Sequence, residues 1–299
     1  MSGEGLDSLD TERVRADLRD LDTRPTAELV ALVVAEQRAV DRALAGATGD
    51  IAAAVDAIAE RMRRGGRLVY LGAGTSGRLA ALDAAECPPT FGIDPGRVVA
   101  LTAGGTAGLT RADEGSEDDG DAAARALAEV GVGPADSVVG VAASGRTPYV
   151  VTGLAAARDA GALTVSVANN AGAEISAVAD VAIELPTGPE LLAGSTRLKA
   201  GSAQKVVLGA LSTLVMVRLG RTYGNLMVDL LAGNTKLRDR ARRIVVEATG
   251  CDPDTAGTAL DRAAGEVKVA LVMLLADVDA DAARLRLDRH GDVRGAVGR

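Results

Sequence analysis

The strongest constraint on the fold is an alternation of short apolar runs and helical patterns through the middle of the chain. The β-branched runs end in Gly, Ser or Asn and cover 67–74, 97–105, 137–144 and 162–170, with a weaker fifth run at 181–188. Ala-rich segments with apolar residues at helical spacing separate them. This alternation predicts an α/β fold, a doubly wound parallel sheet of about five strands flanked by helices. Ligands bind such sheets beyond the carboxyl ends of the strands, so we expect a site in those loops.

Helical patterns lie on both sides of the predicted sheet. Two helices are predicted before it, a long helix after it at about 198–219, and three short helices toward the C-terminus. We therefore divide the chain into an N-terminal helical segment (1–50), a sheet domain (51–243) and a small helical module (244–299).

The composition argues against several classes of protein. Aromatic residues make up 1% of the chain and the net charge is −8. The chain therefore has few aromatic side chains on which bases could stack and no positive field to attract phosphates. Nucleic acid is not an expected partner. The N-terminus is polar, and no apolar run approaches the roughly 18 residues of a membrane span, which predicts a cytoplasmic protein. Cys87 and Cys251 are too few for a disulfide framework or a zinc site.

The first predicted loop, LGAGTSGRL, leads from a strand into a helix that begins near Thr75 and Ser76. Free N–H groups and the positive end of a helix dipole suit phosphate or another anion. Gly72, Gly74 and Gly77 also match the spacing of a dinucleotide site, but no acidic residue ends the second predicted strand to hold a ribose. Ser76 as a simple N-cap is the alternative interpretation.

A second loop, VAASGRTPYV, places Ser144, Gly145 and Thr147 before another helix, and a third cluster, GSTRLKAGSAQK, begins the long helix. Two loops with hydroxyl groups at successive strand ends indicate one shared anionic ligand. Hydroxyls beside cations are typical of phosphate and carboxylate binding. The third cluster can also be read as a capped, solvated helix start. The additional candidate ligands are Arg146, Ser195, Arg197 and Lys199.

Several segments together carry a resemblance to a known family: LGAGTSGRLAALDAAECPPTFG, EGSEDD, ASGRTPYV, GSTRLKAGSAQK and YGNLMVDL. They resemble the SIS domain of sugar-phosphate isomerases and regulators. Within that group they are similar to the etherases that convert N-acetylmuramic acid 6-phosphate and water to N-acetylglucosamine 6-phosphate and D-lactate, in the recycling of peptidoglycan amino sugars. The ATGC-x-P-x-x-A segment resembles the small UBA-like helical module of the same family. The resemblance covers most of the chain beyond residue 50, and it implies a homodimeric carbon–oxygen lyase without metal or organic cofactor.

The resemblance also implies the catalytic residues, with Glu86 as proton donor and Glu117 as the second acid/base. An ether at C3 of a sugar is cleaved by β-elimination once an open-chain aldehyde makes the C2 proton acidic, so acid–base groups suffice. If Glu86 is buried among its Ala, Cys and Pro neighbours, it can stay protonated at neutral pH. Glu117 lies in an acidic run in which Glu114 is the alternative. His290, the only histidine, is either a surface residue or the group that opens the sugar ring.

Two other functions remain open at this level. A sugar-phosphate isomerase would use the same open-chain sugar and release no lactate. A non-enzymatic sugar-phosphate sensor would use the same loops without catalytic carboxyls, which the ECPPT setting of Glu86 disfavours.

Overall fold

A computed structural model describes residues 9–111, 114–230 and 235–298. The chain forms two compact units. The first unit comprises residues 1–85 and 96–212, and the second comprises 86–95 and 213–299.

The first unit is built on a parallel five-stranded sheet in the order β2-β1-β3-β4-β5. All residues of β1, β3 and β4 are buried, as expected for strands covered on both faces. Strand β1 pairs with β2 on one side and with β3 on the other. The chain runs from β1 to β2 and then crosses over to β3, so the topological switch point lies between β1 and β3. The predicted α/β sheet is thereby confirmed. The strands are β1 (Leu68–Gly72), β2 (Val98–Thr102), β3 (Ser137–Ala142), β4 (Leu163–Ala168) and β5 (Val181–Glu184).

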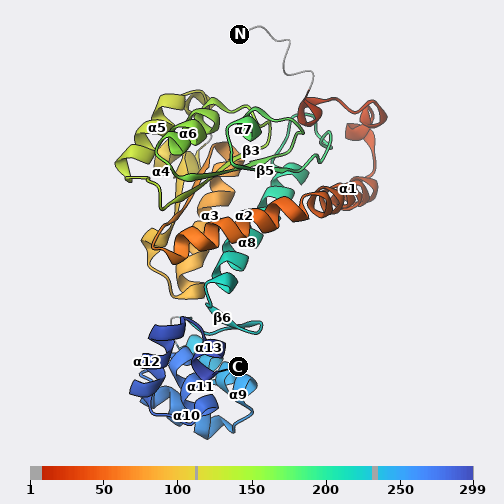
Figure 1. The fold of residues 1–299 in the computed structure, drawn as a ribbon. Coiled ribbons are helices and arrows are strands. Elements are labelled where there is room, and N and C mark those ends of the chain that lie inside the picture. Colours follow the sequence, from red (N-terminus) through yellow and green to blue (C-terminus); the bar gives the residue numbers. More distant parts are fainter. Residues whose placement is uncertain (1–8, 112–113, 231–234, 299) are drawn as a thin grey trace. The chain divides into compact units, whose positions relative to one another are not determined.

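Helices cover both faces of this sheet (Figure 1). Successive side chains of β1 show the two layers. Tyr70 donates a hydrogen bond to Asp83 of α3 at 2.9 Å, whereas Leu71 packs against Gly153 of α6. One face is covered by α2 (Thr48–Arg63), α3 (Gly74–Phe91) and the first part of α8 (Lys199–Arg218), and the other by α5 (Gly120–Glu129) and α6 (Pro148–Asp159).

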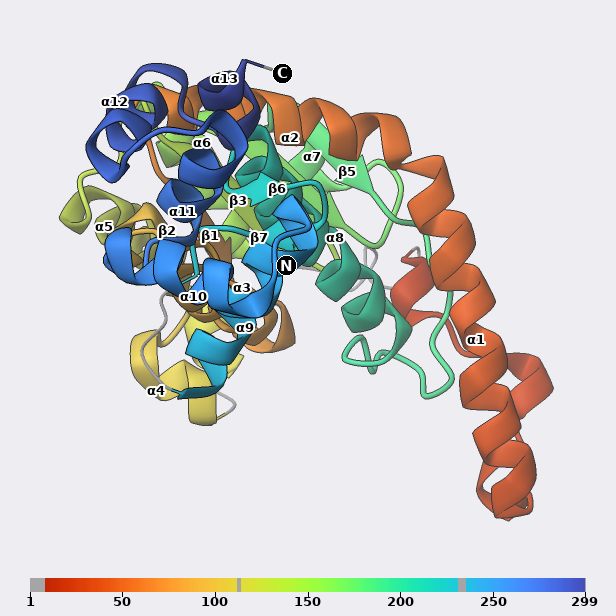
Figure 2. The ribbon, with the colours of Figure 1, turned by 90° about the horizontal axis from the view of Figure 1, so that it is seen from below.

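Shorter elements complete the first unit. The 3-10 turns η2 to η4 precede α1 (Thr26–Gly46), which projects from the sheet in both views (Figure 2). Most of its surface is exposed to solvent. The turns are η2 (Asp10–Glu12), η3 (Ala16–Leu18) and η4 (Leu21–Thr23), and the loops of the sheet carry α4 (Gly105–Thr110), α7 (Glu174–Ala177), η5 (Pro95–Arg97) and η6 (Glu114–Glu117).

The second unit is a small helical bundle with its own apolar core. Aspartates at the N-caps of α10, α12 and α13 accept hydrogen bonds from the first turns of those helices. Ile244 is buried in this core, and the boundary near residue 244 stays a prediction about folding units. The elements are a hairpin of β6 (Thr222–Tyr223) and β7 (Leu226–Met227), then α9 (Thr235–Thr249), α10 (Pro253–Arg262), α11 (Val267–Ala276), α12 (Ala280–His290) and α13 (Val293–Val297).

One helix departs from the expectation about membrane spans. Among the described residues, α8 alone has the length and composition to cross a membrane. Of its most apolar 18-residue stretch, 56% is buried inside the protein. A buried core helix of a soluble protein has the same length and composition.

Candidate functional site

The two predicted hydroxyl loops leave neighbouring strands at the same edge of the sheet. The strands β1 and β3 are paired in parallel with Gly72 opposite Val141, so the loops that follow them lie at the switch point. This is where a doubly wound sheet forms its ligand crevice.

The first loop is shaped by glycines at positions without room for a side chain. A Cβ on Gly77 would lie 2.8 Å from the carbonyl oxygen of Gly72, so the strand and the helix approach through bare backbone. Gly74 has a φ of +52°, in the left-handed region, and begins α3. Thr75 is half-buried and Ser76 is 7% exposed at this helix start. The N–H groups of this first turn face the edge where an anion can bind.

The second loop presents hydroxyl groups that the fold uses little. Gly145 has a φ of +74°, and a Cβ there would lie 2.4 Å from that of Ala173. Thr147 occupies the N-cap of α6 without a side-chain capping bond, and Pro148 opens the helix as predicted. Ser144 Oγ accepts a hydrogen bond from the Arg146 N–H at 3.2 Å, so this bond does not use the hydroxyl proton. The Arg146 guanidinium also lies 3.5 Å from Glu174.

Two asparagines that follow β4 connect the loops, and sequence reasoning did not select them. Asn169 Oδ1 accepts from Gln204 Nε2 at 2.9 Å, and Gln204 Oε1 accepts from Ser76 Oγ at 2.9 Å. Asn170 Nδ2 donates to the carbonyl oxygens of Ala143 at 3.1 Å and Ser144 at 3.4 Å. The available signals were the Asn-Asn pair that ends a strand and the polar Gln204 inside an apolar helix.

The third cluster is more closed than the first two. The Glu190 carboxylate accepts from the backbone N–H groups of Lys199 at 3.2 Å and Ala200 at 2.9 Å, so it caps α8. Burial raises the pKa of Glu190. Ser195 is half-buried and Arg197 is exposed. The start of α8 thus carries its own anion.

The Lys199 ammonium group is also committed to a partner. It is 5% exposed and pairs with Glu36 of α1. Both residues line a cavity of about 380 Å³, together with Arg15, Arg42 and the loop after β5. Phosphate binding by Lys199 remains a prediction, and its charge is already balanced in this structure.

Among the acidic residues after α4, Glu117 is placed beside the first loop. Its Oε1 lies 2.7 Å from the position that a Cβ on Gly74 would take, and the side chain is half-buried. Asp119 instead caps α5 by accepting from the Ala122 N–H at 2.9 Å. Asp113 and the side chain of Glu114 lie outside the described part of the chain.

Glu86 and His290 both belong to the second unit. Glu86 lies on α3 with an exposed side chain, and its backbone carbonyl accepts from Thr90 Oγ1 at 2.8 Å. The burial that would keep Glu86 protonated is therefore not present in the single chain. His290 is the exposed last residue of α12. Within the residues that the structure describes, no group of three or more His, Cys, Asp or Glu side chains is placed to hold a metal ion.

Named etherases match this chain along almost its whole length, and a domain model and a solved structure match part of it. The family model for the glucokinase regulatory protein N-terminal SIS domain matches residues 50–158. The N-acetylmuramic acid 6-phosphate etherase of Rubrobacter xylanophilus is 55% identical over 295 residues, which cover 99% of this chain and 98% of that protein. The etherase of Mycolicibacterium smegmatis is 55% identical over 294 residues, covering 98% and 99%. A solved phosphoheptose isomerase from Francisella tularensis has a TM-score of 0.48 and 13% identity, covering 64% of this chain and 98% of that one.

Proposed function

This chain belongs to the N-acetylmuramic acid 6-phosphate etherase family, and from that premise we propose that it cleaves the D-lactyl ether of N-acetylmuramic acid 6-phosphate. The products are N-acetylglucosamine 6-phosphate and D-lactate, so the protein is a carbon–oxygen lyase of amino-sugar recycling. The observation that carries the proposal is 55% identity to named etherases along nearly the full length of both partners. Neither the isomerase nor the sensor has comparable support.

The substrate phosphate is proposed to bind at the switch point of the sheet. Thr75 and Ser76 stand at the start of α3, and Ser144 and Thr147 stand before α6, with Gly145 allowing the turn between them. The N-terminal ends of two helices, and the Ser144 and Thr147 hydroxyl groups that the fold uses little, favour a dianion. Ser195, Lys199, Arg146 and Arg197 are proposed as further contacts to the phosphate or the lactyl carboxylate.

The chemistry is proposed to need only proton transfers once the sugar ring is open. Glu117 takes the C2 proton of the aldehyde, and the electron pair left on C2 forms the C2–C3 double bond as the C3–O bond breaks. Glu86 gives a proton to the departing lactyl oxygen. As a carboxylate it then deprotonates the water that adds to C3, and C2 regains a proton. A ring-opening role for His290 stays a prediction.

Two wider proposals complete this function. A homodimer fits the apolar face of α1, where Val30 is 58% exposed and Val34 is 65% exposed. A cytoplasmic location fits a charged sugar phosphate, which does not cross a lipid bilayer unaided.

The decisive experiment incubates the protein with N-acetylmuramic acid 6-phosphate and measures both products. We expect D-lactate and N-acetylglucosamine 6-phosphate in equal amounts. An isomerase would convert the sugar without lactate, and a sensor would bind it without turnover, so either result would replace the proposed function.

A further inference from the structure

The arm before α1, residues 9–25, is held against the sheet at a fully buried residue. Thr11 is 0% exposed, although Val14, three residues later, is 71% exposed. A polar side chain buried so completely in a short 3-10 turn requires partners from another part of the fold.

Thr11 finds those partners on the loop after β4. Its backbone N–H donates to Asn170 Oδ1 at 3.4 Å, and Asn170 Nδ2 donates to Thr11 Oγ1 at 3.1 Å. Both ends of one amide group are thus fixed by one residue of the arm. The same Nδ2 reaches the carbonyl oxygens of Ala143 and Ser144, in the second hydroxyl loop.

The Thr11 N–H and the two carbonyl oxygens set the orientation of the Asn170 amide, and the Thr11 hydroxyl adds a third acceptor that holds its NH₂ group in place. With Thr11 in place, the NH₂ group meets the two carbonyl oxygens. If the amide turned over, Oδ1 would face those oxygens, and acceptor would meet acceptor in a site that is 4% exposed. An amide that contacts the loop carrying Ser144 is thus held by a residue more than 130 positions earlier in the sequence.

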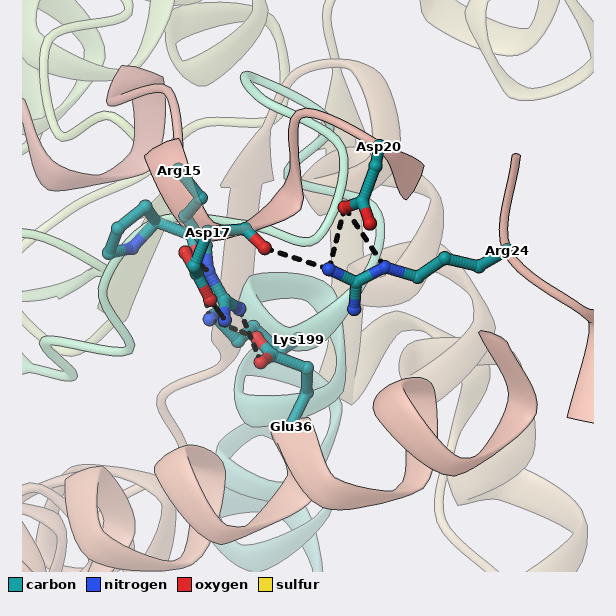
Figure 3. A network of polar contacts seen from close by, with 7 residues as sticks. Arg15, Asp17, Asp20, Arg24, Glu36 and Lys199 are labelled. Atoms are coloured by element: carbon teal, nitrogen blue, oxygen red, sulfur yellow. Dashed lines mark hydrogen bonds and ion pairs between the residues drawn. The ribbon is translucent and has the colours of Figure 1, made fainter. Parts of the chain in front are cut away.

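A second anchor holds the arm close to the same edge of the sheet. Arg15 Nη1 lies 2.6 Å from Glu36 of α1, and Glu36 also pairs with Lys199 at the start of α8 (Figure 3). Burial alone would raise the pKa of the Glu36 carboxyl, but hydrogen bonds from Lys199 and Arg15 outweigh it and hold the pKa below its usual value. Glu12 borders the third cluster as well, since its Oε2 lies 2.9 Å from the Cβ position of Gly194.

We propose that Thr11 is a positioning residue for the phosphate-binding loop Ser144–Thr147 and acts through Asn170. The inference rests on the proposed function, because it assumes that this loop binds the substrate phosphate. Thr11 need not touch the substrate. Its hydroxyl contributes one acceptor that holds in place the amide supporting the loop.

The test compares variants of the full chain that differ in one hydroxyl group. Thr11→Val has nearly the same shape but cannot accept the hydrogen bond, and Thr11→Ser keeps the hydroxyl. Thr23→Val is the matched control, because the Thr23 hydroxyl donates only within the arm, to the Asp20 carbonyl at 2.8 Å. Affinity for N-acetylglucosamine 6-phosphate is measured by calorimetry, and kcat and KM are measured from lactate release.

We expect Thr11→Val to raise Kd and KM about tenfold with kcat within about twofold, which is the effect of one buried hydrogen bond. Thr11→Ser and Thr23→Val should bind within about twofold of the unaltered protein. Thr11→Ala should reproduce the loss, so the test survives if the valine variant folds poorly.

Three outcomes would overturn the inference. They are unchanged Kd in both Thr11→Val and Thr11→Ala, a loss in Thr11→Ser as large as in Thr11→Val, or a fall in kcat without a change in Kd. Ser144→Ala separates this inference from the proposed function. If Ser144→Ala weakens binding while Thr11→Val and Thr11→Ala do not, only the positioning role fails. If Ser144→Ala has no effect, the loop is not the phosphate site and both proposals fail.

Discussion

Glu117 and Glu86, the two carboxylates proposed for catalysis, occupy different surroundings. Glu117 lies beside the backbone of Gly74, at a position that leaves no space for a Cβ on that glycine. Glu86 is exposed on α3, four residues before a Thr whose hydroxyl bonds its carbonyl. A group at the loop that is proposed to bind substrate suits proton abstraction from the sugar.

Isosteric substitutions of these residues should fail in different ways. We expect Glu117→Gln to abolish exchange of the C2 proton with deuterated solvent, because that residue is the proposed base. Glu86→Gln should still exchange while it fails to expel lactate. Each should lose about 10²- to 10⁴-fold in kcat, the usual effect of one acid–base group. Exchange is followed by proton NMR of the substrate, and lactate is followed by an enzymatic assay.

Asp118→Asn is the control for this pair, since its side chain is exposed next to Glu117. It should keep both exchange and lactate release. If Glu86→Gln lost exchange while Glu117→Gln kept it, the two roles would be reversed. Full lactate release by Glu117→Gln would move the second role to Glu114.

At the scale of elements, the sequence predicted the strands and main helices because their signals are local. Runs of β-branched residues located β1 through β5, and the helical spacing after residue 198 located α8. The support of the loops is not local. Asn170 donates a hydrogen bond to Thr11, and Glu190 caps the start of α8. Both contacts form only in the folded chain. Apolar periodicity says nothing about which distant polar groups will meet.

At the edge of the sheet where the strands begin, one aspartate accepts several hydrogen bonds. Asp136, just before β3, accepts hydrogen bonds from the Arg67 N–H at 2.9 Å, the Arg67 guanidinium at 2.7 Å and the Gly133 N–H at 3.1 Å. Burial alone would raise the pKa of the Asp136 carboxyl, but the hydrogen bonds from Arg67 and Gly133 outweigh it and hold the pKa below its usual value. The pair joins the beginnings of β1 and β3.

Asp136→Asn should destabilise the first unit by about 2 to 3 kcal/mol at pH 7, because an amide NH₂ would face the Arg67 donors. The pKa of Asp136 is lower in the folded state than its unfolded value of about 3.9. The carboxylate therefore stabilises the fold at a pH above that value, and this stabilisation is lost as the pH falls through the folded pKa. The difference between variant and unaltered protein should therefore shrink below about pH 4. Urea unfolding at pH 7 and pH 3 measures it.

Glu60→Gln is the matched control, because Glu60 is 54% exposed and pairs with the surface arginines Arg63 and Arg64 at the end of α2. Its effect should stay under about 1 kcal/mol at both pH values. A loss for Asp136→Asn that is equal at pH 7 and pH 3 would contradict the ionic explanation.

At the scale of the whole molecule, the division of the chain could not be read from composition. The segment 86–95 interrupts the sheet domain in sequence and belongs to the second unit, where Gly92 lies against the backbone of Asp229. A Cβ on Gly92 would stand 2.1 Å from the Asp229 carbonyl oxygen, so only glycine permits this approach. Pro88 and Pro89 mark this segment in the sequence, but α3 continues through both, so the local pattern does not say that the segment joins another unit.

The proposed homodimer makes the last prediction. Val30 and Val34 are one turn apart on α1, so they lie on the same face of the helix, and nothing in the described part of the chain covers them. A Val30→Asp, Val34→Asp double variant would place two carboxylates in an apolar contact, which costs several kcal/mol if that contact is a subunit interface. We expect light scattering after size exclusion to give the mass of one chain, 30.2 kDa, for this variant and twice that for the unaltered protein.

Leu285→Asp, at a similarly exposed apolar residue of α12, should leave the dimer intact. If the double variant keeps the doubled mass, α1 is not the contact between subunits, and if the unaltered protein already has the mass of one chain, the dimer itself is wrong.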